Sequence, residues 1–395
     1  MISFDEAVAL VGEAQRPLER ELVRLAAAHG RVLAQEVVAR VASPPSDVSA
    51  MDGYALRSDD LAALPARLRV IGESFAGGGF GGAVGAGECV RIFTGAPIPA
   101  GADRVAIQEI VTRDGDFALL AEPPGEARHI RRRGGDFAVG DVLLAPGRRI
   151  DARALVAIAG ADLAEVELFR RPRVAILATG DELVAPGEAA GRAEALPESV
   201  SFGIAALVAD WGGEDVNRRR LADDLPAMRE AAGEALAGAD LVVVTGGASV
   251  GERDFAKAMF EPHGLELVFA KVAIKPGKPV WLGRSGERLV MGLPGNPTSA
   301  LVTARLLLTP LLAGLCGRDP AEALRWRRAP LAEPLGPCGG RETFVRAARE
   351  DGKARPLPNQ DSSAQKTLAA ADLLIRRPAD APAAGAGDLV EVLEF

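Results

Sequence analysis

The chain has 395 residues, too many for one hydrophobic core, so we expect about two to four domains. Its net charge of −8 argues against a nucleic-acid-binding protein, because that class usually presents a strongly basic face. Three Cys and three His residues are scattered without the spacing of a zinc site or a disulfide framework. We find no leader pattern and no run of about 18 apolar residues, so we expect a cytoplasmic protein with neither a membrane nor a nucleic-acid partner.

The N-terminal half combines helical and β patterns. Helical spacing of apolar residues predicts two helices within residues 2–40, and we assign residues 1–45 together with 140–170 to a helical region. Short β-rich runs between Gly and Pro clusters predict an inserted β-rich domain at residues 46–139.

The C-terminal half predicts an α/β domain followed by a small β domain. Continuous apolar runs at 174–178 and 241–244 alternate with helical patterns, which is typical of a doubly wound, mostly parallel sheet at residues 171–318. Short strands predict a C-terminal β domain at 319–395. The predicted fold class is therefore multidomain α/β, with this sheet domain flanked by an N-terminal helical and β region and a small C-terminal β domain.

Polar residues and glycines follow the predicted parallel strands. Ligands of such sheets bind beyond the carboxyl ends of the strands, where glycine N–H groups can hold phosphate and carboxylates can hold Mg²⁺. Helix capping explains the Thr-Gly-Asp-Glu run and the Asp-Asp pair equally well. The candidates at the strand ends are Asp181, Glu182, Asp223, Gly246, Gly247, Gly251 and Asp254.

Residues 271–297 read KVAIKPGKPVWLGRSGERLVMGLPGNP and contain Lys271, Lys275 and Lys278, half of the six Lys in a chain with 46 Lys and Arg residues. Lys is a compact point charge, whereas Arg is a planar fork. Flanking prolines stiffen the segment, and Asn296 followed by proline predicts a helix N-terminus, which favours an anion. The segment predicts an oxyanion site; a solvated basic loop is the alternative.

Seven motifs occur in order: SAMDGYAL, RIFTGAPIPAGAD, RRRGGDF, RVAILATGDELV, TGGASVGERDF, KVAIKPGKPVWLG and GLPGNPTSA. With them the chain resembles the molybdopterin molybdenumtransferase family, molybdenum insertases related to the gephyrin E domain. The resemblance implies insertion of molybdate into adenylylated molybdopterin, with Mg²⁺-dependent hydrolysis and release of AMP. It implies a homodimer, formed through the helical region, whose active cleft is shared between subunits. It also implies a molybdopterin adenylyltransferase and molybdoenzyme apoproteins as partners.

The resemblance assigns roles to particular residues. Asp52 and Thr94 would act across the dimer, and Asp223 and Asp254 would hold the metal and contact the adenylate. Asp181, Glu182 and Lys271 would complete the catalytic cleft together with Lys275. The cofactor- and molybdate-binding residues would be Gly246, Gly247, Ser249, Gly251, Lys275, Lys278, Ser299, Arg346 and Ser362.

One stretch departs from the family pattern. After TGDELV the family usually has an acidic residue, a small hydroxyl residue and Asn, whereas this chain has Glu198, Ser199 and Val200. Val can neither donate nor accept a hydrogen bond, so a substrate contact is expected to be lost. The alternatives are an adenylyltransferase-like enzyme, which would adenylylate molybdopterin with ATP, and a dimeric carrier or scaffold, which would bind without releasing AMP.

Overall fold

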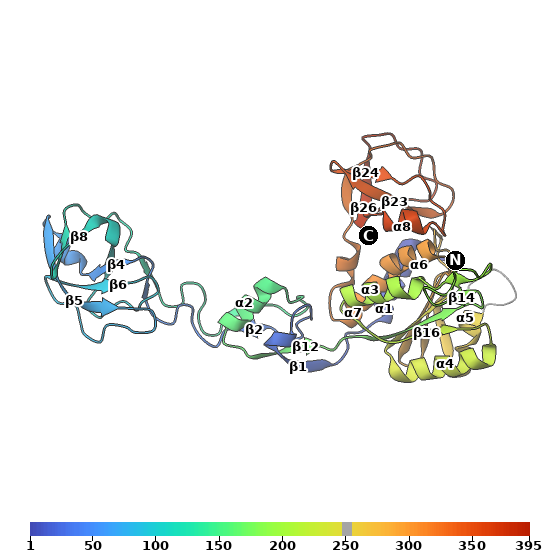
Figure 1. The fold of residues 1–395 in the computed structure, drawn as a ribbon, viewed down its shortest axis with the longest axis horizontal. Helices are drawn as coiled ribbons and strands as arrows, with labels where there is room; N and C mark the ends of the chain where they lie inside the picture. Colours follow the sequence, from blue (N-terminus) through green and yellow to red (C-terminus); the bar gives the residue numbers. More distant parts are fainter. Residues whose placement is uncertain (247–254) are drawn as a thin grey trace.

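The computed structural model describes residues 1–246 and 255–395. The molecule is elongated, with a β domain at one end, a small middle module, and an α/β domain beside a C-terminal β domain at the other end (Figure 1). Both termini lie at the α/β end (Figure 1). The chain therefore runs out to the distant β domain and returns.

The first helix belongs to the α/β end of the molecule. Helix α1 (Phe4–Ala14) begins with a capping box, in which Ser3 Oγ accepts from the Glu6 N–H and the Glu6 carboxylate accepts from the Ser3 N–H. Its buried face joins the same hydrophobic core as helix α7 (Thr309–Leu315). The assignment of residues 1–45 to one helical region is therefore wrong for this helix.

The second helix expected within residues 2–40 is also wrong. Residues Arg20–Arg24 form strand β1, which pairs antiparallel with β12 (Glu165–Phe169), and only the short 3₁₀ turn η1 (Leu25–Ala27) follows. Pairing with a strand distant in sequence overrides local helical spacing. The expected helical region thus also contains paired strands.

The middle module is completed by a second strand pair and one helix. Strand β2 (Val37–Val38) pairs with β11 (Val142–Leu144), and helix α2 (Ala152–Gly160) packs over them. Asp151 caps this helix by accepting the Ala154 N–H at 2.8 Å. The hydrophobic core of the middle module contains Leu33, Ile150, Ile158 and Leu168.

An ion-pair cluster joins the middle module to the α/β domain. Arg170 donates to both carboxylate oxygens of Asp240, with nitrogen–oxygen distances of 2.8 and 3.0 Å. The same guanidinium donates to Glu19, and Arg288 donates to Asp240 at 3.0 Å. Hydrogen bonds to Asp240 and Glu19 raise the pKa of Arg170, although burial opposes this.

The distant β domain is built on one six-stranded sheet in the order β7-β4-β6-β5-β9-β8, with β3 and β10 paired beside it. Its main core lies around Leu56, Leu68 and Leu120. Its elements are β3 (Val48–Ser49), β4 (Gly53–Leu56), η2 (Ser58–Leu61), β5 (Ala66–Ser74), β6 (Glu88–Ile92), β7 (Arg104–Ile107), η3 (Gln108–Ile110), β8 (Val111–Asp114), β9 (Phe117–Leu120) and β10 (Ile130–Arg131).

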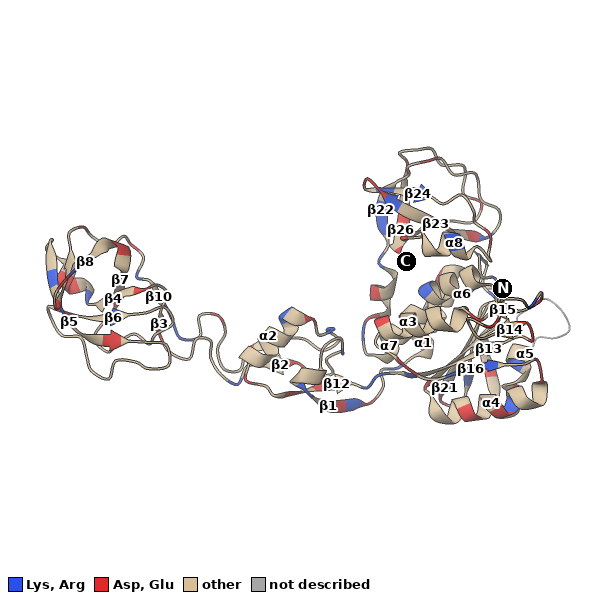
Figure 2. Ribbon diagram, in the orientation of Figure 1, with Lys and Arg blue, Asp and Glu red and all other residues tan. Residues whose placement is uncertain are grey.

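The α/β domain has a six-stranded sheet in the order β16-β13-β17-β21-β20-β18, whose first four strands are parallel. Helix α3 packs on one face and α4 on the other, which confirms the doubly wound prediction. Helix α4 carries charged residues on its outer side (Figure 2). The elements are β13 (Arg173–Thr179), β14 (Leu183–Val184), β15 (Leu196–Pro197), α3 (Val200–Asp210), β16 (Glu214–Leu221), α4 (Leu225–Gly238), β17 (Leu241–Thr245), α5 (Phe255–Ala258), η4 (Glu261–His263), β18 (Leu265–Phe269), β20 (Trp281–Ser285) and β21 (Arg288–Leu293).

One long apolar helix fills the centre of this end of the molecule. Pro297–Leu315 comprises α6 (Pro297–Thr303), the π-helical turn η5 (Ala304–Leu308) and α7. It is long and apolar enough to cross a membrane, so the expectation that no such run exists is wrong. In the structure 94% of its apolar window is buried, as in the core helix of a folded domain.

The C-terminal β domain includes a strand from the Lys-rich segment. Its sheet order is β19-β23-β25-β26-β22, with β24 paired to β23. Arg305 of the long helix donates to the backbone oxygens of Glu394 and Ala323 at 2.8 and 2.7 Å, and burial lowers its pKa to about 10. The elements are β19 (Ile274–Lys275), η6 (Pro320–Leu324), β22 (Arg327–Pro330), β23 (Glu342–Glu350), β24 (Lys353–Pro356), α8 (Gln365–Ala369), β25 (Leu373–Arg377) and β26 (Leu389–Glu394).

The attachment of α1 to the α/β end can be tested with Phe4→Ala. Phe4 is 1% exposed, and its ring packs edge-on against Phe344 with centroids 5.0 Å apart. Removing a buried ring should lower the free energy of unfolding by about 3–5 kcal/mol, measured by chemical denaturation. Phe202→Ala, whose ring is 48% exposed, is the matched control and should change stability by less than about 1 kcal/mol. Equal effects of the two variants would contradict this packing.

Candidate functional site

A cavity of about 1060 Å³ lies at the carboxyl edge of the parallel strands. Strands β13 and β17 end in its wall at Thr179 and Thr245. The Thr179 hydroxyl donates a hydrogen bond of 3.2 Å to the Thr245 backbone oxygen. Its other lining residues are Gly180, Glu182, Leu183, Leu196, Pro197, Glu198, Ser199, Val200, Asp223, Gly246, Pro279, Pro294, Gly295, Asn296, Pro297, Ser363 and Gln365.

The acidic candidates from two neighbouring strands meet at this edge. Asp181 accepts the backbone N–H of Asp223 at 2.9 Å. Glu182 lies so close to Gly180 that a Cβ there would be 2.7 Å from its carboxylate. Asp224 stands at the N-cap of α4 without a side-chain cap bond, so capping does not account for the Asp-Asp pair.

Gly246 makes the junction of the strand ends possible. It has φ of +89°, and a Cβ would lie 2.3 Å from the Thr179 backbone oxygen. A Cβ added to Gly295, which follows β21, would lie 3.3 Å from the Gly246 Cα. The remaining glycine-loop candidates, Gly247, Ser249, Gly251 and Asp254, lie outside the described residues.

The Lys-rich segment lies between the long helix and the C-terminal sheet. Gly277 has φ of +103°, and a Cβ there would be 2.0 Å from Thr303 of α6. Lys275 pairs with Thr343 in the β19–β23 ladder. The side chains of Lys271, Lys275 and Lys278 are exposed, and within residues 1–246 and 255–395 none of them forms an ion pair. The oxyanion role stays a prediction.

A loop of the C-terminal domain docks on the start of α6. Asn296 Nδ2 donates to Ser362 Oγ at 2.8 Å, and the Thr298 N–H donates to the Ser362 backbone oxygen at 3.1 Å. Ser299, the next residue of α6, is 5% exposed. Thus Ser299 and Ser362, predicted from separate motifs, lie on segments in direct contact. Asn296 was expected to cap the helix, but its side chain makes no cap bond.

Arg346 is held beside the same loop. Its side chain is 1% exposed and donates to the Asp361 backbone oxygen at 3.0 Å. Its Nε is buried and has no hydrogen-bond partner in the part of the chain that is described. Burial lowers the pKa of Arg346, an effect that Asp361 partly opposes. Gln360, which sequence reasoning missed, clasps the Arg346 backbone by two bonds of 2.9 Å.

Asp52 and Thr94 are in contact, although 42 residues separate them. The Thr94 N–H and hydroxyl both donate to Asp52 Oδ1 at 2.7 Å. These bonds, the backbone one first, lower the pKa of Asp52. The pair lies next to β4 and β6 in the β domain, at the end of the molecule opposite the cavity (Figure 1).

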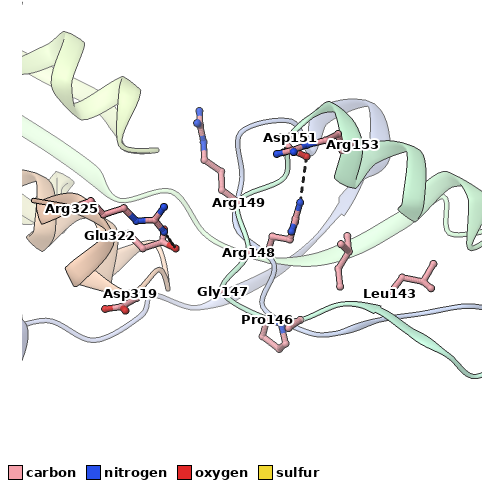
Figure 3. Close-up of a pocket in the computed structure, with 12 residues that line it drawn as sticks. Leu143, Pro146, Gly147, Arg148, Arg149, Asp151, Arg153, Asp319, Glu322 and Arg325 are labelled. Carbon is pink, nitrogen blue, oxygen red and sulfur yellow. Dashed lines mark hydrogen bonds and ion pairs between the residues drawn. The ribbon is translucent and has the colours of Figure 1, made fainter. Parts of the chain in front are cut away.

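A second cavity, of about 720 Å³, opens between the middle module and η6 (Figure 3). Its charged side chains largely pair with one another: Arg153 and Arg148 with Asp151, and Arg325 with Glu322. None of the described candidate residues lines it. The cavity at the strand ends is therefore the candidate site.

Two residues next to α3 also line the candidate site. Glu198 is 7% exposed and accepts hydrogen bonds from the Ser201 N–H and hydroxyl. Val200 is equally buried and packs into the main core, so the position that departs from the family pattern is apolar wall. Sequence comparison marked Val200, whereas nothing marked Glu198 as a cavity residue.

The fit of a Mg²⁺ ion can be judged from the donors present. Among residues 1–246 and 255–395 no group of three acidic, His or Cys side chains could hold a metal alone. Mg²⁺ commonly takes only one or two carboxylates and completes its shell with phosphate and water. Asp223, held next to Asp181, is suited to that kind of partial shell.

The fold and the cavity define a multidomain α/β protein whose candidate ligand site lies at the carboxyl edge of a parallel sheet. Residues 2–161 match the family model described as the MoeA N-terminal region (domain I and II). Residues 175–314 match a probable molybdopterin binding domain, and residues 328–395 match the MoeA C-terminal region (domain IV).

Individual proteins agree with these models. A molybdopterin molybdenumtransferase of Haemophilus influenzae is 37% identical over 332 residues, which cover 84% of this chain and 80% of that protein. Molybdopterin molybdenumtransferase 2 of Mycobacterium tuberculosis is 32% identical over 100% of both chains. A crystal structure of the molybdopterin biosynthesis moeA protein from Pyrococcus horikoshii matches over 100% of both chains, with a TM-score of 0.88 and 27% identity. The chain belongs to the molybdopterin molybdenumtransferase family and is a transferase of molybdenum cofactor biosynthesis.

The hydrogen bonds at Asp52 predict a measurable titration. Thr94→Val removes the hydroxyl donor, so the pKa of Asp52 should rise toward its ordinary value of 3.8. Because the folded pKa is lowered, the associated stabilisation exists above pH 3.8 and is lost as the pH falls through the folded value. Carboxyl ¹³C NMR titration measures both midpoints. Thr112→Val, at an exposed position of β8, should leave the Asp52 midpoint unchanged, and a midpoint that did not move in Thr94→Val would contradict the assignment.

Proposed function

We propose that the chain inserts molybdate into adenylylated molybdopterin and hydrolyses the adenylate bond with release of AMP. The observation that carries this proposal is the contact between Asn296 and Ser362, 2.8 Å long, at the wall of the cavity that Asp223 and Gly246 also line. Through this contact the cavity at the sheet edge, where a phosphate group would bind, lies next to the segments that carry the candidate oxyanion residues Ser299 and Ser362. Such an arrangement suits a reaction between a nucleotide-linked ligand and an oxyanion.

The oxyanion would be held by residues of both C-terminal segments. Lys275 and Lys278 supply positive charge without an ion-pair partner in the described chain, and Arg346 supplies a guanidinium whose Nε is unsatisfied. Ser299 and Ser362 supply hydroxyl groups from contacting segments. Charge-assisted hydrogen bonds of this kind bind tetrahedral dianions strongly.

The adenylate end would be held at the sheet edge. Asp223 and Asp254 would hold Mg²⁺, which when bound supplies positive charge to the phosphate oxygens. Gly246 lines the cavity at this edge, and its backbone would face the phosphate. Glu182 lines the cavity at the same edge, and Asp181 contacts Asp223 there. These two carboxylates would orient the attacking water. Lys271 would add charge at the cleft.

A second subunit would complete the site. Asp52 and Thr94 adjoin β4 and β6 in the β domain, which lies at the opposite end of the molecule from the α/β domain (Figure 1), so one chain does not bring them to its own cavity. A homodimer in which each β domain reaches the partner's cavity would do so. The adenylyltransferase and apoprotein partners and the cytoplasmic location are further predictions from the resemblance.

A non-catalytic cofactor carrier is the second candidate, because Val200 forms apolar wall where the family pattern has a hydrogen-bonding side chain. A carrier would bind the adenylylated substrate without releasing AMP. An assay of AMP release with molybdate, Mg²⁺ and adenylylated molybdopterin separates the two functions.

The metal role predicts the effect of Asp223→Asn. Loss of one carboxylate at the metal should lower AMP release by about a hundredfold, with the fold retained by circular dichroism. Asp224→Asn is a matched control, since Asp224 is the neighbouring exposed carboxylate and does not line the cavity. Equal rates in Asp223→Asn and the wild type would remove the proposed metal role.

The preference for Lys predicts the effect of conservative Arg substitutions. Lys275→Arg and Lys278→Arg keep the charge but replace a compact ammonium with a wide planar group. Each should raise the molybdate concentration for half-maximal AMP release by about tenfold, or about 1.4 kcal/mol. Lys353→Arg, at an exposed position of β24, should behave as the wild type. If the rate of AMP release depends on molybdate concentration in the same way for all variants, the shape of the cation at these positions does not matter for oxyanion binding.

The shared cleft predicts complementation between inactive variants. Asp52→Asn and Asp223→Asn should each be nearly inactive alone. After mixing and subunit exchange, about half of the dimers should be heterodimers, and each heterodimer should carry one intact site of two. The mixture should therefore regain about a quarter of the wild-type rate. No recovery, with heterodimers verified by mass spectrometry, would mean that Asp52 does not serve the partner's cavity. Light scattering that shows only monomer would contradict the homodimer itself.

A further inference from the structure

Glu198 is a buried carboxylate inside the candidate cavity. Strands β14 and β15 and the start of α3 fix its backbone, and its N–H donates to the Val184 oxygen at 2.8 Å. Ser201 donates to both carboxylate oxygens, through its N–H at 2.8 Å and through its hydroxyl. The carboxylate is therefore held in one orientation.

Among residues 1–246 and 255–395, no positively charged side chain compensates this carboxylate. Within the described residues no Lys, Arg or His lies in ion-pair distance of Glu198. An ionised carboxylate accepts about four hydrogen bonds, and Ser201 supplies two. Burial of a charge with unused acceptor sites is costly unless other donors reach it. Because Glu198 lines the cavity, a ligand there can supply the missing donors.

The walls beside Glu198 are apolar. Leu183 and Leu196 pair across β14 and β15, and Leu196 is 57% exposed although it lines the cavity. Pro197 continues this surface on one side of Glu198, and Val200 continues it on the other side beyond Ser199. A carboxylate set in an apolar wall suits a flat ring that offers N–H groups along one edge.

We propose that Glu198 binds the pyrimidine edge of the pterin, accepting hydrogen bonds from its 2-amino group and its N3–H. This inference rests on the function proposed above and adds the orientation of the substrate. A pterin offers two adjacent donors, which match the two oxygens of a carboxylate. Adenine offers a donor beside a ring acceptor, which a carboxylate does not match. The pterin therefore lies at the start of α3, and the adenylate phosphate lies toward Asp223 and Gly246.

A purely structural role for Glu198 makes a different prediction. The N-cap residue of α3, Ser199, makes no side-chain cap bond, and Glu198 satisfies the Ser201 N–H in its place. If capping were its whole role, substitution would lower thermal stability by the same amount with or without ligand. The selectivity of the cavity between ring systems would not change.

The test compares 6-hydroxymethylpterin with 6-hydroxymethyllumazine, in which a carbonyl replaces the 2-amino group. Equilibrium binding is followed by the fluorescence of the pteridine. The wild-type protein should prefer the pterin by about tenfold or more. Glu198→Gln should lose about tenfold in pterin affinity and should gain relative affinity for lumazine, because a Gln amide can donate to the new carbonyl. Affinity for AMP should be unchanged.

Two further variants separate binding from folding. Glu194→Gln, at an exposed position of the same segment, is the matched control and should keep the wild-type preference. Glu198→Asp keeps the charge on a shorter side chain, so it should weaken pterin binding without gaining lumazine affinity. If Glu198→Gln does not fold, Glu198→Asp provides the test. If the ratio of pterin affinity to lumazine affinity is unchanged in these Glu198 variants, this inference is overturned while the proposed function still stands. If the wild-type protein binds neither pteridine, the proposed function fails and this inference fails with it.

Discussion

Burial of the long apolar helix Pro297–Leu315 is the constraint on which the rest of the structure depends. Its side chains share one core with α1, with one face of the parallel sheet, and with Phe344, Leu374 and Leu393 of the C-terminal β domain. Segments from the beginning, middle and end of the chain are thereby fixed against a single element. Arg305, buried in the π-helical turn, adds hydrogen bonds to the last strand, which a purely apolar helix could not make.

This shared core explains how the candidate site is assembled. The start of the long helix lies at the cavity wall, and the loop that carries Ser362 bonds to it. The turn at Gly277 packs on the same helix at Thr303, which brings the Lys-rich segment alongside. One buried helix thus fixes the position of the cavity at the sheet edge relative to the groups that the C-terminal β domain supplies. Preorganisation of this kind is what charge-based catalysis requires.

The sequence predicted those parts of the fold that depend on local patterns. Continuous apolar runs identified β13 and β17, because both faces of a parallel strand are buried. The pattern at residues 18–25 was misread as helical because β1 is stabilised by β12, which lies far away in sequence. The destination of α1 could not be predicted either, since an amphipathic helix shows that it has a buried face but not which core receives it. The same reasoning applies to the site. Sequence patterns identified Asp181, Asp223 and Ser362, and they marked Asn296 only as a helix start. The bonds of Asn296 to Ser362, of Glu198 to Ser201 and of Gln360 to Arg346 exist only in the folded chain.

The fork-shaped pairing of Arg170 with Asp240 has a mechanical consequence. A single hydrogen bond acts as a pivot, but two parallel bonds between planar groups also resist rotation. The pair lies where the middle module leaves the α/β domain, and the β domain extends beyond that module like the far end of a lever (Figure 1). A small angular change at this junction displaces each residue of the arm in proportion to its distance from the junction. The guanidinium–carboxylate pair therefore resists rotation at the junction beyond which the β domain carries Asp52 and Thr94.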